Sequence, residues 1–331
     1  MSSSTKMKAA INTVYGAPEV VKVMEVEKPT PNHNEVLIKI HNTTVNRTDC
    51  GFRSAEYFIS RFFSGLFKPK NPILGCEFAG EIEAIGQHVK TCKIGDRVFG
   101  YNDSKFGGHA EYMTLAENAF FTTIPHNMPY EEAAPIAEGA HYALSIIKAA
   151  KVTKGQKVLI NGATGAIGSA GVQLLKHFGA EVTAVCDTKN VALVKSLGAD
   201  RVIDYQKENF TQINQTFDFV FDAVGKSSFG LCKPLLNKNG IYISTELGKN
   251  GQNVFLALFA PLLGTKKVLF PMPSIHKEDI IFLKNLVETG VFKPVIDRQY
   301  PLEKIVEAYQ YVELGYKTGN VVVTVSDALQ R

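Results

Sequence analysis

The sequence predicts an α/β protein built from a β-rich domain and a doubly wound parallel-sheet domain. Its 331 residues exceed the usual size of a single hydrophobic core. From Lys8 to Phe121, short β-like runs such as residues 36–40 are separated by Pro, Gly and Asn. From Tyr130 onward, short apolar strands alternate with helical segments. This alternation predicts βαβ units and a parallel sheet that is buried on both faces.

The charged residues argue against a nucleic-acid partner. Lys and Arg number 36 and Asp and Glu number 32, which leaves a formal net charge of only +4. The basic residues are scattered among acidic ones and form no basic patch. A small-molecule partner is therefore expected.

The cysteines and the apolar segments predict a cytoplasmic protein without a membrane span. An odd number of widely spaced cysteines argues against a disulfide framework and for a reducing compartment; they are Cys50, Cys76, Cys92, Cys186 and Cys232. The N-terminus is polar where a signal peptide needs an apolar run. The most apolar stretch, residues 254–270, is interrupted by Pro261, Gly264 and two lysines, so we expect a buried helix and strand there.

A glycine-containing turn follows the apolar strand that begins at Lys157. Gly162, Gly165 and Gly168 lie between this strand and an amphipathic helix that ends at Gly179. Small residues in such a turn let the backbone approach a pyrophosphate, whose charge is stabilised by free N–H groups and the helix dipole. An ordinary tight turn is the alternative. The strand, turn and helix in this order favour a dinucleotide site.

The next strand bears on which nicotinamide cofactor binds. An NAD site usually has an acidic residue at the end of this strand, where Cys186 stands here. Lys189 can neutralise a 2′-phosphate, which favours NADPH. Asp187 lies one residue after the position at which an acidic residue usually contacts the ribose. NADH therefore stays open as the alternative cofactor. Lys189 as a solvated side chain and Asp187 as a turn former are the ordinary interpretations.

Several ordered segments resemble the medium-chain dehydrogenase/reductase superfamily, in its zinc-free quinone oxidoreductase branch. They are MKAAINTVYGAPEVVKVMEVEKPTPNHNEVLIKI, NPILGCEFAGEIEAIG, KIGDRVFGY, GGHAEY and NGATGAIG. The resemblance implies a GroES-like substrate domain over residues 1–126 and 272–331. It also implies a Rossmann domain that binds the cofactor over residues 127–271.

Two zinc ligands of the alcohol dehydrogenases in this superfamily are replaced here. Asn46 stands where the first thiolate would be, and Cys76 takes the place of the histidine in a Gly-His-Glu motif. A neutral Asn is a poor zinc ligand, so we expect no metal. A rebuilt site from Cys76, Glu77, Glu138 and His141 is the alternative, and Cys76 as a small buried residue is the ordinary interpretation.

Without a Lewis acid, oxidation of a simple alcohol is disfavoured, whereas an activated acceptor needs mainly to be positioned against the nicotinamide. The resemblance therefore implies an NADPH-dependent reductase of a quinone or an α,β-unsaturated carbonyl. Two alternatives stay open. One is a zinc-dependent alcohol dehydrogenase with atypical ligands, and the other is a low-activity NADPH-binding structural or regulatory protein.

Four residues are candidates for the chemistry. We expect Asn46 beside the nicotinamide or substrate carbonyl, with Asp49 orienting the loop, although capping and backbone hydrogen bonds are the ordinary roles of these residues. Tyr57 is expected to line the substrate pocket, or else to be a lid or core aromatic. His141 replaces a Thr common in relatives and could deliver a proton, or simply pack within its helix.

The resemblance implies further cofactor contacts at the carboxyl edge of the second sheet. They comprise Thr164, Gly165, Ala166 and Ile167 in the glycine turn, then Tyr205, Ala223, Val224, Ser244, Thr245, Phe270 and Met272, with Asn320 from the C-terminal segment. By the same analogy the apolar stretch of residues 253–270 contains an edge strand that pairs across a two-fold axis, which predicts a homodimer.

Overall fold

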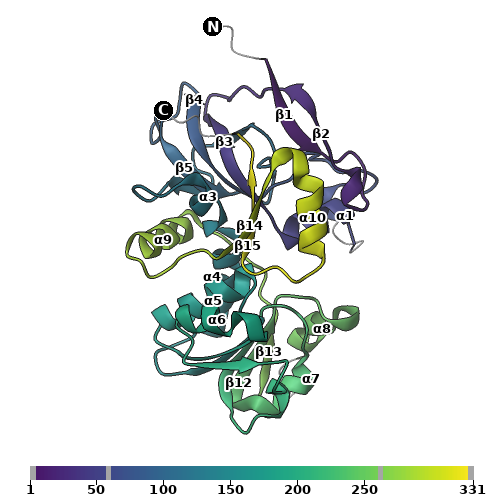
Figure 1. Ribbon diagram of the computed structural model, residues 1–331, viewed down its shortest axis with the longest axis vertical. Coiled ribbons are helices and arrows are strands. Elements are labelled where there is room, and N and C mark those ends of the chain that lie inside the picture. Colours follow the sequence, from purple (N-terminus) through teal and green to yellow (C-terminus); the bar gives the residue numbers. More distant parts are fainter. Residues whose placement is uncertain (1–4, 57–60, 260–263, 327–331) are drawn as a thin grey trace. The chain divides into compact units, whose positions relative to one another are not determined.

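The computed structural model describes residues 5–56, 61–259 and 264–326, and these residues form two compact units (Figure 1). The first unit contains residues 1–138, 276–288 and 296–331, and the second contains residues 139–275 and 289–295. The sequence expectation placed the divisions at residues 126 and 272. The difference at the first division arises because α3 (Tyr130–Ala133) and the 3-10 helix that follows it pack on strands of the first unit.

The first unit is built on a seven-stranded sheet with the order β14-β15-β3-β4-β5-β7, and β6 pairs with β3. These strands are β3 (Glu35–Val45), β4 (Glu77–Ile85), β5 (Arg97–Tyr101), β6 (Tyr112–Ala116), β7 (Phe121–Thr123), β14 (Ile296–Pro301) and β15 (Asn320–Thr324). A separate antiparallel pair is formed by β1 (Lys6–Ile11) and β2 (Lys22–Glu27). The sheet confirms the β-rich first half, and β15 of the C-terminal segment pairs with β3 in it.

Helices of the first unit include α1 (Arg47–Ser54), α2 (Arg61–Ser64), α9 (Lys277–Glu288) and α10 (Ile305–Glu313). Figure 1 shows α10 in yellow, and it packs against β3 and β15. Alternating side chains of the strands fill the core on one face of the sheet, as the period-2 pattern predicts. This core contains Val36, Ile38, Ile40, Phe78, Ile82, Val98, Met113, Leu115 and Phe121.

The second unit is a six-stranded parallel sheet with the order β10-β9-β8-β11-β12-β13. The strands are β8 (Lys157–Asn161), β9 (Glu181–Cys186), β10 (Arg201–Asp204), β11 (Phe217–Asp222), β12 (Leu236–Ser244) and β13 (Lys267–Leu269). Its helices include α4 (Glu138–Ala150), α5 (Ala166–His177), α6 (Val191–Ser196), α7 (Phe229–Cys232) and α8 (Gln252–Leu258). This strand order is that of a Rossmann sheet, whose order reverses next to β8.

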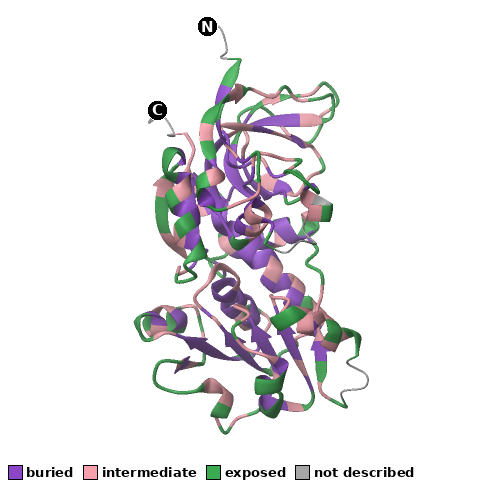
Figure 2. Cartoon of the chain, turned by 90° about the vertical axis from the view of Figure 1, so that its right-hand side faces the viewer, coloured by how far each residue is buried: buried purple, intermediate pink, exposed green. Residues whose placement is uncertain are grey.

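The central strands of the second sheet are buried along most of their length, as Figure 2 shows in purple. Their apolar runs are covered on both faces, which explains why they do not alternate with polar residues. The core includes Leu159, Val185, Ile203, Phe217, Val220, Phe229, Leu236, Tyr242 and Val268. Among the described residues, short 3-10 helices occur at Pro18–Val20, Ala134–Ile136, Thr188–Asn190, Phe210–Gln212, Lys233–Leu235, Lys249–Gly251 and Leu302–Lys304.

The apolar stretch of residues 254–270 is less buried than the sequence indicated. Val268 in β13 is buried, but Phe255 and Leu258 in α8 are 59% and 69% exposed. The expectation of a buried helix was therefore wrong for these two side chains, because α8 packs on β13 at the edge of the sheet and has only one covered face. No helix in residues 5–56, 61–259 and 264–326 is long and apolar enough to cross a membrane.

Candidate functional site

The glycine turn follows β8 in the second unit and depends on two close backbone approaches. Gly162 has a φ of +81°, and a Cβ there would lie 2.7 Å from the side chain of Val224. A Cβ on Gly168 would lie 2.0 Å from the carbonyl oxygen of Gly162. Larger residues cannot be placed at either position without moving the backbone. The glycines therefore bring the end of β8 and the start of α5 together.

The N-terminus of α5 opens onto half-exposed residues of the turn. The helix has twelve residues with Gly165 as its N-cap, and within the described chain no side chain caps it. A Cβ on Gly165 would meet nothing within 4 Å. The first N–H groups of a helix and its dipole together favour an anion, so this turn fits the pyrophosphate of a dinucleotide.

The cofactor contacts expected in the second unit all lie at or after the carboxyl ends of its strands. Thr164–Ile167 follow β8, Lys189 follows β9, Tyr205 follows β10, Ala223 and Val224 follow β11, Ser244 and Thr245 lie at the end of β12, and Phe270 and Met272 follow β13. This is the edge at which open α/β sheets bind ligands. Met272 is 79% exposed and Ser244 only 4% exposed, so the side chain of Met272 is far more accessible to a ligand than that of Ser244.

The loop after β9 places one basic and two acidic groups close together. The Asp187 carboxylate accepts a hydrogen bond from the Asn190 amide (2.6 Å) and lies 3.9 Å from Lys189 Nζ. Thr188 donates to Asp204 at the end of β10 (2.6 Å). Asp187 thus stabilises its own turn, while the exposed Lys189 side chain extends from it.

Asn46 lies in the first unit, immediately before α1, and both N–H groups of its side chain are used. They donate to Thr44 Oγ1 (2.7 Å) and to Glu77 Oε2 (2.9 Å). The side chain is 3% exposed. In this structure Asn46 therefore holds Glu77 and the end of β3 at the start of α1.

Asp49 is fully buried and joins α1 to the turn before β4. Its carboxylate accepts the N–H of Asn46 (2.9 Å), as in a capping box, and the N–H of Gly75 (3.0 Å). Burial raises the pKa of this carboxyl group, and the nearby His109 opposes the rise. Asp49 thus orders the backbone at Asn46, which is the loop that the sequence expected it to orient.

Two further carboxyl groups, Glu77 and Glu138, lie beside Asn46. Glu77 accepts from Thr44 Oγ1 (2.8 Å) and from the backbone N–H of Glu138 (2.5 Å). Glu138 accepts from Thr48 Oγ1 (2.5 Å), and Cys76 Sγ lies 3.2 Å from its other oxygen. The five residues Thr44, Asn46, Thr48, Glu77 and Glu138 therefore form one hydrogen-bonded cluster.

Burial raises the pKa values of the carboxyl groups in this cluster and of the Cys76 thiol beside them. It raises the pKa of Glu77 to about 7, although three hydrogen-bond donors lower it in part. Burial raises the pKa of Glu138 well above the ordinary range, and the negative charges of Glu77 and Asp49 raise it further. The pKa of the Cys76 thiol is also raised well above its usual value by burial and by the neighbouring carboxylates. Cys76 is therefore a neutral thiol.

The remaining predicted residues are distributed over both units. His141 lies in α4, is 2% exposed and packs edge-on against Tyr142, with the ring centroids 4.5 Å apart. Asn320 is a buried residue at the start of β15 in the first unit. Tyr57 lies outside the described residues.

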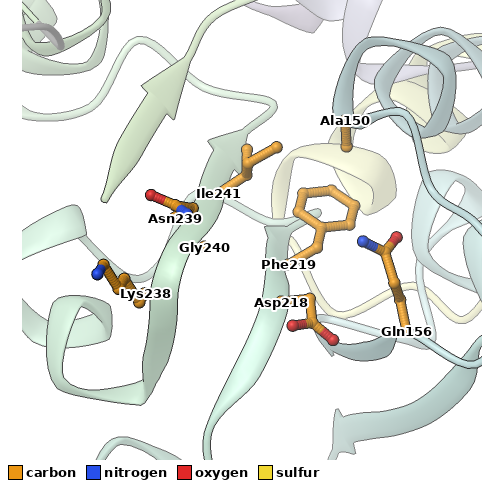
Figure 3. A pocket seen from close by; sticks show the side chains of 8 residues that line it. All are labelled: Ala150, Gln156, Asp218, Phe219, Lys238, Asn239, Gly240 and Ile241. Atoms are coloured by element: carbon orange, nitrogen blue, oxygen red, sulfur yellow. The ribbon is translucent and has the colours of Figure 1, made fainter. Parts of the chain in front are cut away.

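A small pocket of about 160 Å³ occurs elsewhere in the second unit (Figure 3). Gln156 precedes β8 and Asp218 lies near the start of β11, so the pocket is at the opposite end of these strands from the glycine turn. The remaining lining residues are Ala150, Phe219, Lys238, Asn239, Gly240 and Ile241. It is therefore separate from the edge expected to hold a dinucleotide.

The sequence analysis did not identify Thr44 and Thr48 as members of the cluster. It considered Glu77 and Glu138 only as alternative metal ligands. A signal was present at Glu138, since this acid is flanked by the apolar run of residues 133–137 and by Gly139 and Ala140. An acidic residue in a buried apolar segment needs hydrogen-bond partners. The partners described above, Thr48, Cys76 and Glu77, come from two distant segments, which no local pattern reveals.

Comparison with known proteins agrees with this architecture. Residues 32–126 match the family described as alcohol dehydrogenase GroES-like domain, and residues 197–323 match the family described as zinc-binding dehydrogenase. The 2-methylene-furan-3-one reductase of Solanum lycopersicum is 32% identical over 98% of this chain and 80% of its own length. The chain belongs to the medium-chain dehydrogenase/reductase superfamily, in its quinone oxidoreductase-like branch.

Two further members of the superfamily illustrate the similarity. The chloroplastic NADPH-dependent alkenal/one oxidoreductase of Arabidopsis thaliana is 29% identical over 96% of this chain and 79% of its own length. The solved structure of a quinone oxidoreductase from Coxiella burnetii superposes with a TM-score of 0.87 at 26% identity, covering 97% of this chain and 100% of that chain.

The name of one matched family includes zinc, but the donor set of this medium-chain reductase does not fit a zinc ion. By the resemblance Asn46 stands at the position of a thiolate ligand, and its amide donates both of its side-chain N–H groups to Thr44 and Glu77. Zinc requires deprotonated thiolate, imidazole or carboxylate ligands. Among the residues that the structure describes, no three or more His, Cys, Asp or Glu side chains form a group that could hold a metal ion.

Two glycine substitutions are expected to separate folding from cofactor binding. Gly168→Ala should lower the thermal midpoint and abolish NADPH binding, because its Cβ would lie 2.0 Å from the Gly162 carbonyl oxygen. Gly165→Ala should leave the midpoint within a few degrees of the wild type and weaken NADPH binding, since its Cβ enters space that a pyrophosphate needs. Calorimetry and titration of NADPH fluorescence measure both effects. Equal NADPH affinity of Gly165→Ala and the wild type would contradict a pyrophosphate at this turn.

Proposed function

We propose that this chain is an NADPH-dependent reductase that transfers hydride to a quinone or an α,β-unsaturated carbonyl without a metal ion. The observation that carries the proposal is the glycine turn at the N-terminus of α5, on the carboxyl edge of a Rossmann sheet. The names of relatives, which include a furanone reductase, an alkenal/one oxidoreductase and quinone oxidoreductases, support the substrate class. They do not favour the alternatives of an alcohol dehydrogenase or a structural protein.

Residues of both units have roles in this proposal. A reduced nicotinamide supplies hydride when it is bound. Thr164–Ile167 would hold its pyrophosphate through backbone N–H groups, and the remaining residues at the carboxyl edge would contact its nucleotide portions. Asn320 in β15 is proposed to contact the cofactor from the first unit. Tyr57 is proposed to line the substrate pocket.

Asn46 and His141 are proposed to support the chemistry in different ways. Asn46 positions the Glu77 carboxylate by donating to it, and Asp49 fixes the backbone of Asn46. His141 is proposed to deliver the proton that completes reduction of the acceptor after hydride transfer. Exclusion of water by the buried surroundings of both residues strengthens these interactions.

Turnover with a simple quinone and a short enone tests the proposed function and both assignments. Wild-type protein should oxidise NADPH with at least one of these acceptors. Asn46→Ala and His141→Ala should each lower kcat by about tenfold to a hundredfold, the usual effect of losing one oriented donor. His126→Ala, at an exposed histidine of the first unit, serves as the matched control. If neither substitution changes turnover, both assignments are wrong.

Tight NADPH binding without oxidation across a panel of quinones and enones would favour the structural or regulatory alternative. Stoichiometric zinc in active protein purified without added metal would favour the alcohol dehydrogenase alternative. These two measurements distinguish the rival functions from the proposed one.

Lys189 is proposed to favour NADPH over NADH by pairing with the 2′-phosphate. Lys189→Ala should raise the KM for NADPH about tenfold and leave the KM for NADH nearly unchanged, because only NADPH carries this charge. Lys195→Ala, at an exposed lysine of α6, is the control. If Lys189→Ala raises the KM values for NADPH and NADH equally, Lys189 does not bind the 2′-phosphate.

We also propose a homodimer in a reducing compartment such as the cytoplasm. The strand β13 forms one edge of the six-stranded sheet, and such an edge can pair with a second copy. All five cysteines are free. Sedimentation equilibrium should give twice the 36.3 kDa mass of the chain, and a monomeric mass would contradict the dimer.

A further inference from the structure

One buried carboxylate joins three strands of the second unit near their carboxyl ends. Asp222 is the last residue of β11 and is fully buried. Its Oδ1 accepts a hydrogen bond from the amide of Asn161 at the end of β8 (2.9 Å). Its Oδ2 accepts from the backbone N–H of Ser227 (3.0 Å) and from the hydroxyl of Tyr242 in β12 (3.3 Å). The side chain of Asp222 therefore connects β8, β12 and the loop after β11.

Backbone hydrogen bonds reinforce these side-chain contacts. The N–H of Ala223 donates to the carbonyl of Asn161 (3.0 Å), and the N–H of Thr245 donates to the carbonyl of Asp222 (3.1 Å). Burial and the negative charge of Asp222 raise the pKa of the Tyr242 hydroxyl well above its usual value, so this group keeps its proton and donates. A buried carboxylate is stable only with such a set of donors. The ends of β8, β11 and β12 are thus fixed relative to one another.

The turns that follow these strands also pack directly against one another. A Cβ on Gly162, after β8, would lie 2.7 Å from the side chain of Val224, after β11. Gly225 has a φ of +65°, and a Cβ there would lie 2.2 Å from Cγ of Glu246, after β12. The turn after β11 therefore cannot move without moving its neighbours on both sides.

The positions that Asp222 holds adjoin the segments proposed to contact the cofactor. Asn161 immediately precedes the glycine turn, Asp222 precedes the two contact residues after β11, and Tyr242 lies two residues before those at the end of β12. Lys189 and Tyr205 follow β9 and β10, which lie on the other side of β8 in the strand order. The Asp222 contacts thus belong to one half of the carboxyl edge.

We propose that Asp222 is a positioning residue that fixes the pyrophosphate turn after β8 against the segments after β11 and β12 that would hold the nicotinamide half of NADPH. The proposal rests on the proposed function. Because the carboxylate is fully buried, it acts through the backbone that it holds. Its loss should weaken binding of the pyrophosphate and nicotinamide portions and leave the adenosine portion, on the side of β9 and β10, nearly unaffected.

The same strand carries a matched control at its other end. Asp218, near the start of β11, accepts from the backbone N–H of Lys157 in β8 (2.9 Å) and from the amide of Asn237 in β12 (2.8 Å). It therefore joins the same three strands as Asp222, but at the edge opposite the glycine turn. A general requirement for an intact sheet predicts similar effects of replacing either aspartate, whereas a positioning role predicts an effect on NADPH only for Asp222.

The experiment measures ligand affinity of Asp222→Asn, Asp218→Asn and the wild type in the full-length protein. Asp222→Asn keeps the shape of the side chain and an acceptor for Asn161, but its amide nitrogen cannot accept from Ser227 or Tyr242. Its Kd for NADPH should rise about tenfold, the usual effect of losing one hydrogen bond to a charged group. Its Kd for adenosine 2′-phosphate, which has neither pyrophosphate nor nicotinamide, should change less than about twofold.

Two further comparisons sharpen the test. Asp218→Asn should bind NADPH and adenosine 2′-phosphate as the wild type does. Tyr242→Phe removes only the longest of the three side-chain contacts of Asp222 and should raise the Kd for NADPH about threefold. With an acceptor that the wild type reduces, Asp222→Asn should raise the KM for NADPH about tenfold and leave kcat at saturating NADPH within about threefold of the wild type.

The outcomes separate the two proposals. An unchanged Kd of Asp222→Asn for NADPH, an equal loss of affinity for NADPH and adenosine 2′-phosphate, or an equal loss in Asp218→Asn would overturn the positioning role and leave the proposed function standing. NADPH binding by a wild type that reduces no quinone or enone would overturn the proposed function, and the affinities would still decide the role of Asp222. If Asp222→Asn does not fold, the Kd of Tyr242→Phe for the two ligands decides it.

Discussion

The carboxylate of Glu77 in β4 joins two other segments of the first unit that are far apart in the sequence, residues 44–46 and Glu138. It accepts hydrogen bonds from Thr44 at the end of β3, from Asn46 before α1 and from the backbone N–H of Glu138 at the start of α4. Removing a carboxylate from water costs several kcal/mol, and only a set of well-placed donors offsets this cost. The positions of Asn46 and Glu138 therefore depend on this one buried group.

The second unit depends on a different constraint, the close approach of backbone to backbone at the glycine turn. Gly168 leaves no room for a Cβ beside Gly162, and Asn161 and Ala223 connect the ends of β8 and β11 by a hydrogen bond of 3.0 Å. Asp222, fully buried, accepts from the Asn161 amide (2.9 Å). These contacts present the N-terminus of α5 at the carboxyl edge, where an anion is stabilised without a basic side chain.

The two units offer different chemical environments. The N-terminus of α5 in the second unit offers backbone N–H groups that favour an anion, and the first unit contains carboxyl groups whose pKa values are raised by burial. By the resemblance, Asn46 and Cys76 stand at the positions of two zinc ligands of the alcohol dehydrogenases. In this medium-chain reductase both residues contact the buried carboxyl groups of Glu77 and Glu138.

The sequence by itself determined the β-rich first half, the alternation of strands and helices in the second half and the glycine turn, because periodicity and turn residues are local properties. The exposure of Phe255 and Leu258 and the unit boundary at Glu138 were decided only by tertiary structure, since both depend on which elements pack together. The same holds for Asn46. Its amide donates to Thr44 and Glu77, and a hydrogen bond between residues 31 positions apart leaves no trace in a local sequence pattern.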